Sequence, residues 1–70
     1  MESEMFKQLM QMTYNDSDEQ VLNAIDALAD FWCHEKAVEE RLIELTINSS
    51  IQIKQAAVLA LAKIAIAQNK

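Results

Sequence analysis

The 70-residue sequence contains neither glycine nor proline. Tight β-hairpin turns and G1 bulges rely on glycine, so the absence of this residue disfavours a β-rich fold. Alanine, leucine, glutamate, glutamine, lysine and methionine are frequent instead, and these residues favour helices. The composition therefore predicts an all-α chain.

The sequence also lacks the residues that hold many very small domains together. Cys33 is the only cysteine, which excludes an internal disulfide and fits a reducing compartment, so we expect a cytoplasmic protein. Cys33 and His34 are adjacent, and adjacent residues rarely ligate one tetrahedral ion together, so no metal site is predicted. A domain this small buries only about 60% of its unfolded surface. Stability must therefore come from well-packed helices, self-association or a partner.

Basic and reactive residues are sparse. The formal net charge is −5 and no basic stretch is present, which disfavours nucleic acid as a partner. The start MESEMF is acidic where a signal peptide is basic, and the longest apolar run is short and interrupted by lysines, so no membrane segment is expected. Only Cys33-His34-Glu35 suggests chemistry, and neighbouring side chains at a helix end diverge. We therefore predict no enzyme, no catalytic residue and no cofactor.

Polar breaks near residues 15–17, 33–36 and 48–50 predict four helices, at about 3–14, 17–33, 36–47 and 50–68. Ser17 and Gln20 have the spacing of a capping box, and Ser49 or Ser50 is expected to cap the last helix. Asn48 suits a left-handed helix end in a chain without glycine. Apolar residues at helical spacing are predicted to face inward. They are Met5, Phe6, Leu9, Met10, Met12, Val21, Ala24, Ile25, Leu28, Phe31, Trp32, Val38, Leu42, Leu45, Ile53, Ala56, Ala57, Ala60, Leu61 and Ile64.

The two halves of the chain match when one is shifted by 33 residues. The matches in the turn, where a Thr-x-Asn-x-Ser pattern recurs, carry more weight than matches between alanines. We therefore predict a single domain, 1–70, made of two tandem antiparallel helical hairpins, 2–34 and 35–67, stacked as a minimal α-solenoid. The matched pairs are Leu9/Leu42, Met10/Ile43, Met12/Leu45, Thr13/Thr46, Asn15/Asn48, Ser17/Ser50, Ala24/Ala57, Ala27/Ala60, Leu28/Leu61, Ala29/Ala62 and Phe31/Ile64.

The stretch IKQAAVLALAKI, residues 53–64, resembles the second helix of the short HEAT-like repeats of phycobilisome-lyase-type proteins. In that family pattern an aliphatic and a basic residue come first, followed by two alanines, Ala-Leu, a small residue and an aliphatic residue. The matching residues here are Ile53, Lys54, Ala56, Ala57, Ala60, Leu61, Ala62 and Ile64. Ala62 stands where the family usually has glycine, and the first repeat departs further, with Gln20 and Val21 at the leading pair. The resemblance implies a HEAT-like solenoid that binds proteins. Two alternatives stay open, an accessory to a chromophore-lyase-type enzyme and a fragment or designed piece of a longer solenoid.

The last predicted helix carries more apolar residues than one neighbouring hairpin can cover. The extra residues are Val58, Leu59, Ala62 and Ile66. They form the candidate interface together with Trp32, for which two interpretations stay open, an anchor in the core and a hot spot of the interface. The sequence therefore favours a non-enzymatic protein–protein interaction module that self-associates through this helix, most simply as a two-fold homodimer.

Charge is distributed unevenly along the chain. Residues 1–35 hold eight acidic residues against Lys7, whereas residues 36–70 hold five basic residues against three acidic ones. The acidic half could pair with the basic half of a second copy, or the charges could simply keep two helical faces in water.

Overall fold

The computed structural model describes residues 4–68, and this range folds into four α-helices without a strand. They are α1 (Glu4–Met12), α2 (Asp18–Phe31), α3 (Lys36–Ile47) and α4 (Ile51–Gln68). The predicted all-α class is confirmed, and α3 and α4 have the predicted bounds to within a residue. The predicted start of the first helix, Ser3, lies outside the described residues.

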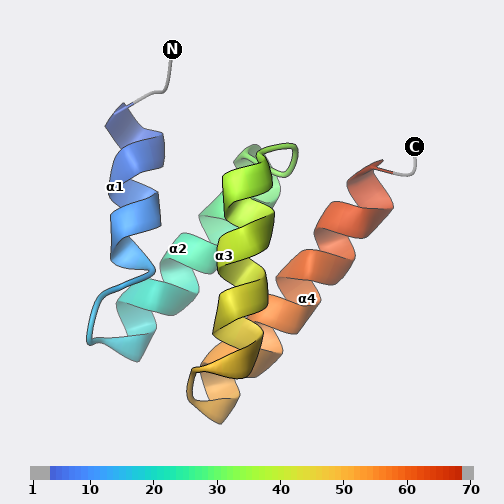
Figure 1. Ribbon diagram of the computed structural model, residues 1–70. Coiled ribbons are helices and arrows are strands. Elements are labelled where there is room, and N and C mark those ends of the chain that lie inside the picture. Colours follow the sequence, from blue (N-terminus) through green and yellow to red (C-terminus); the bar gives the residue numbers. More distant parts are fainter. Residues whose placement is uncertain (1–3, 69–70) are drawn as a thin grey trace.

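Consecutive helices run in opposite directions, and the fold is a flat, two-layered arrangement of 32 × 25 × 15 Å (Figure 1). α1 packs on α2 and α3 packs on α4. In addition, α2 packs directly on α4, although α3 separates the two in the sequence. The contact between α2 and α4 joins the two halves of the chain. The core at these contacts contains Phe6, Val21, Ile25, Leu28, Ala29, Val38, Leu42, Leu45, Ile53, Ala57, Ala60 and Ile64.

Two predicted core residues lie on the surface instead. Phe31 and Met5 are both exposed, whereas Ile64 and Val38, which lie 33 positions further along the chain, are buried. Ile64 and Val38 belong to the second half of the chain, which packs against the first half. Phe31 and Met5 face away from that contact, and no helix in residues 4–68 covers them. The inward assignment of these two side chains was therefore wrong.

The helix ends differ in detail from the prediction. Ser50 caps α4, because its Oγ accepts a hydrogen bond from the Ile53 amide at 3.4 Å. Ser17 has the extended backbone of an N-cap residue, but its side chain makes no capping bond, and Asn15 Oδ1 accepts the Ser17 N–H at 2.9 Å. Asn48 ends α3 with φ of −116°, so the predicted left-handed conformation was wrong. No described residue has a positive φ, which explains how the fold dispenses with glycine.

Candidate protein-interaction surface

The outward side of the second half of the chain carries the largest group of exposed aliphatic side chains on one helix. Val58 is 55% exposed, Leu59 67% and Ile66 63%, and Ala62 is also exposed. Ile53, Ala57, Ala60 and Ile64 face the core from the opposite side of α4. The structure thus places the four predicted interface residues of this helix in solvent.

Two open grooves run between α3 and α4 on this side. One, of about 520 Å³, is lined by Thr46 of α3 and by Lys54, Gln55, Val58 and Leu59 of α4. The other, of about 200 Å³, is lined mainly by Glu39 and Ile43 of α3 and by Leu61 and Ala65 of α4. The contribution of α3 was not anticipated from the sequence. We call the following set the outer face: Glu39, Ile43, Thr46, Lys54, Val58, Leu61, Ala62 and Ala65.

Trp32, the fifth predicted interface residue, lies elsewhere. It is partly buried against the core, and its ring centroid lies 5.7 Å from that of Phe6 in α1. Phe31 meets it edge-on at 6.2 Å. Trp32 therefore anchors α1 on α2, and does not belong to the outer face.

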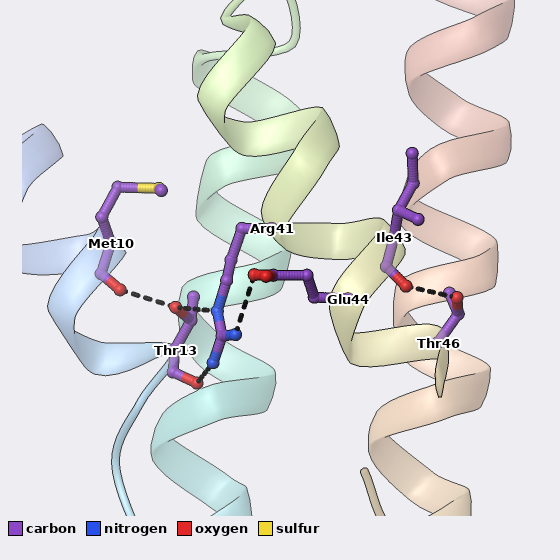
Figure 2. A network of polar contacts seen from close by, with 6 residues as sticks. All are labelled: Met10, Thr13, Arg41, Ile43, Glu44 and Thr46. Carbon is purple, nitrogen blue, oxygen red and sulfur yellow. Dashed lines mark hydrogen bonds and ion pairs between the residues drawn. The ribbon is translucent and has the colours of Figure 1, made fainter. Parts of the chain in front are cut away.

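Arg41 of α3 connects the two halves of the chain (Figure 2). Its Nε donates to Thr13 Oγ1 at 3.0 Å and a terminal amino group donates to the Thr13 carbonyl at 2.8 Å. The other amino group pairs with Glu44 at 3.2 Å, and the guanidinium lies 3.6 Å from the centroid of the Tyr14 ring. Arg41 thus holds the end of the first helix against α3 through charge-assisted bonds and a cation–π contact.

Sequence comparison of the two halves missed this contact because Gln8 occupies the position equivalent to Arg41. The signal that could have found it is compositional, since Arg41 is the only arginine in the chain. Arginine forms multidentate contacts at helix ends more readily than lysine does.

Thr13 and Thr46, which are equivalent under the 33-residue shift, share one local geometry. The Thr13 hydroxyl donates to the Met10 carbonyl and the Thr46 hydroxyl to the Ile43 carbonyl, both at 2.6 Å (Figure 2). Thr13 is buried beneath Arg41, whereas in residues 4–68 no donor faces Thr46 in the same way. Thr46 therefore presents an uncovered copy of the site that Arg41 occupies.

This difference predicts unequal effects of one substitution at the two positions. Thr13→Val removes a buried hydroxyl that both donates and accepts, and leaves Arg41 Nε without its partner, so a loss of about 1–3 kcal/mol in the free energy of unfolding is expected. Thr46→Val, the matched control, should change it by no more than about 0.5 kcal/mol. Urea denaturation monitored by circular dichroism measures both. Equal losses would contradict the assignment of Arg41 as a connection between the halves.

A third, polar hollow of about 400 Å³ lies between the turns that precede α2 and α4. Three of its four charged side chains already have partners inside the chain, because Arg41 bonds to Thr13 and Glu44 and because Ser50 Oγ donates to Asp18 at 3.1 Å. In the described part of the chain no group of three His, Cys, Asp or Glu side chains is arranged to hold a metal ion. These polar groups therefore serve the contact between the two halves.

By length and composition alone, α4 is long and apolar enough to cross a membrane, and 22% of it is buried within the fold. Its 18 residues rise about 27 Å, close to the thickness of roughly 30 Å of a hydrocarbon core. The expectation from the sequence concerned the longest uninterrupted apolar run, and the absence of a membrane segment stays a prediction, since a core helix of a soluble protein can have the same length and composition.

Comparison with known proteins returned no matching family model, and no curated protein or solved structure with significant similarity.

Proposed function

We propose that the chain is a non-enzymatic protein–protein interaction module built from two stacked HEAT-like repeats, and that it binds through the outer face. One observation carries the proposal. The first hairpin has a side that the second hairpin covers. The equivalent positions of the second hairpin form a similar side, and that side is exposed.

The comparison can be followed position by position. A shift of 33 residues relates Ile25 to Val58 and Ala29 to Ala62. Ile25 and Ala29 are buried in the core, with 1% and 5% exposure, on the helix that packs against α4, while Val58 and Ala62 lie in solvent. The same shift relates the buried Thr13 to the half-exposed Thr46. The outer face thus has the shape and spacing of a surface that already accepts a helical hairpin once in this chain.

Polar contacts between the two hairpins support stacking in a fixed register. Lys63 pairs with Asp30 at 3.5 Å, Ser50 bonds to Asp18, and the Gln68 amide donates to the Cys33 carbonyl at 3.4 Å. These contacts join residues 33, 32 and 35 positions apart, close to the repeat length. Equivalent positions therefore lie side by side, as in a repeat stack.

A protein partner suits the outer face better than a lipid bilayer does. Insertion of α4 into a bilayer would withdraw Ile53, Ala57 and Ile64 from the core, each of which contributes to folding by being buried there. The charged residues Lys54 and Lys63 also flank the exposed aliphatic side chains of α4, which are Val58, Leu59, Ala62 and Ile66. An accessory role in chromophore attachment has no corresponding observation, so the interaction module is the function that we propose, in the cytoplasm.

Site-specific photo-crosslinking in cells that produce the protein tests this proposal. Position 59 suits the photoreactive probe, because Leu59 lines the same groove as Val58, Lys54 and Thr46 of the outer face. The probe should form discrete protein adducts that Val58→Glu removes. The matched control is the same probe at the exposed Asp26, the position equivalent to Leu59 in α2. Identical adducts from both positions would contradict the proposal. Co-sedimentation of the intact chain with phosphatidylglycerol-containing vesicles would favour a membrane surface and would also contradict it.

A further inference from the structure

We propose that the outer face binds the opposite end of a second copy, so that the chains stack head to tail. This inference rests on the proposed function, because it requires the outer face to be a protein-binding surface. It differs from the two-fold homodimer that the sequence suggested, in which the last helices of two copies meet.

The opposite end of the molecule carries a matching surface. We call the following set the leading face: Met5, Gln8, Gln20, Ala27, Asp30 and Phe31. Met5 is 64% exposed and Phe31 76%, although the equivalent residues of the second hairpin, Val38 and Ile64, are buried. A second copy that packs on α4 as α4 packs on α2 would bury both side chains. Two otherwise unexplained exposed side chains, an aromatic and a methionine, would then be covered.

Charge fixes the register of this contact. Asp30 and Lys63 are equivalent positions and form an ion pair inside the chain at 3.5 Å. In the stack, Asp30 of the second copy would lie beside Lys63 of the first copy, on the side away from the first copy's own Asp30. Acidic and basic side chains would then alternate along the stack. The first half of the chain has an excess of acidic residues and the second half an excess of basic residues, so the overall charge of the two ends also favours head-to-tail contact. An exposed pair contributes little affinity, but such complementarity selects orientation and register.

A two-fold contact over α4 offers no such charge complementarity. The helix contains Lys54 and Lys63 but no acidic residue, so pairing two copies of α4 brings no opposite charges together within the two helices. The head-to-tail arrangement, by contrast, places Asp30 of one copy beside Lys63 of the other, and complementary charges favour one orientation over another.

The polar site at Thr46 also finds a donor in this arrangement. Arg41 covers Thr13 within the chain, and Gln8 is the residue equivalent to Arg41 in the first hairpin. In a head-to-tail contact the side-chain amide of Gln8 from the second copy would face Thr46, and an amide nitrogen can donate to the hydroxyl or to the carbonyl. Such a contact is heterologous, so it continues from copy to copy unless the rotation closes a ring.

Two variants with one blocked end each provide the test. Met5→Glu with Phe31→Glu blocks the leading face, and Val58→Glu with Ala62→Glu blocks the outer face. All four positions are exposed, so both variants should keep the helical circular dichroism of the unmodified chain. Sedimentation velocity from low to high micromolar concentration then measures association. We expect the unmodified chain to form species larger than a dimer, each variant alone to stay monomeric, and an equimolar mixture of the two to form a dimer through the unblocked ends.

Other outcomes separate the possibilities. If the variant with a blocked leading face dimerises alone and the mixture forms no mixed dimer, the contact is two-fold and the head-to-tail inference fails. If the unmodified chain and the mixture remain monomeric, self-association fails altogether, while adducts of the position-59 probe with another protein would still support the proposed function. If no protein adduct forms either, both proposals fail.

Discussion

Replacing Ile25 with alanine is expected to leave much of the protein unfolded at room temperature. Ile25 is 1% exposed at the contact where α2 meets the rest of the core. Truncation of a buried isoleucine to alanine typically costs about 2–5 kcal/mol. A core in a chain of this size rarely supplies more than about 3–5 kcal/mol, and no disulfide adds to it. A single substitution is therefore comparable to the whole stability.

Val58→Ala is the matched control, because Val58 holds the equivalent position in α4 and is exposed. At low micromolar concentration it should change the free energy of unfolding by no more than about 0.5 kcal/mol. Helical circular dichroism as a function of urea concentration measures both variants. If Ile25→Ala and Val58→Ala were equally stable, the assignment of one face as covered and the other as open would be wrong.

Ala57→Leu should also destabilise the fold strongly. Ala57 is fully buried on α4, the helix that packs against both α2 and α3, and a small side chain there lets the helices approach closely. A leucine must displace neighbours already in contact, which typically costs about 1–3 kcal/mol. Because each 1 kcal/mol moves the Tm of a domain this size by roughly 4–8 °C, the change is readily measured by thermal unfolding.

Ala62→Leu serves as the control for this substitution, since it makes the same change on the exposed side of the same helix. Its Tm at low concentration should stay close to that of the unmodified chain. An unchanged Tm for Ala57→Leu would show that the helical phase deduced for α4 is wrong.

The helices were predictable because their boundaries depend on local chemistry. Short polar runs at 15–17 and 48–50 interrupt otherwise helix-favouring sequence, and Ser50 caps α4 as its position suggested. The end of α1 was less predictable. Beyond Met12 the chain continues through Asn15 with amides bonded three residues back, a tightened last turn that sequence does not distinguish from regular helix.

The candidate surface was predictable in its helix but not in its extent. Counting apolar residues identified Val58, Leu59, Ala62 and Ile66, because a single neighbour cannot cover every side of a helix. The part contributed by α3 depends on the angle between α3 and α4, which cannot be predicted from the spacing of apolar residues in the sequence. Phe31 was misplaced for a related reason, because its burial depends on a neighbour that only the second hairpin possesses.

The contact made by Arg41 illustrates a different limit. Its partners, Thr13 and Tyr14, lie 28 and 27 positions earlier, and neither pairing follows from helical spacing. The repeat comparison pointed elsewhere, since it pairs Arg41 with Gln8. Sequence similarity between the two halves reveals what they share, whereas the contact between them depends on residues that differ.

The near-constant separation of the contacts between hairpins also bears on how the chain reaches its native state. The polar contacts that join the hairpins connect residues 28 to 35 positions apart, and the helix packing joins consecutive helices and, in addition, α2 with α4. Native contacts thus form without first closing a loop much longer than about half of the chain, and the entropy of loop closure rises with loop length. Helical domains in which most contacts join residues close in the sequence reach the native state within microseconds to milliseconds. The chain has no proline whose isomerisation would add a slow phase, so refolding should be a single fast event.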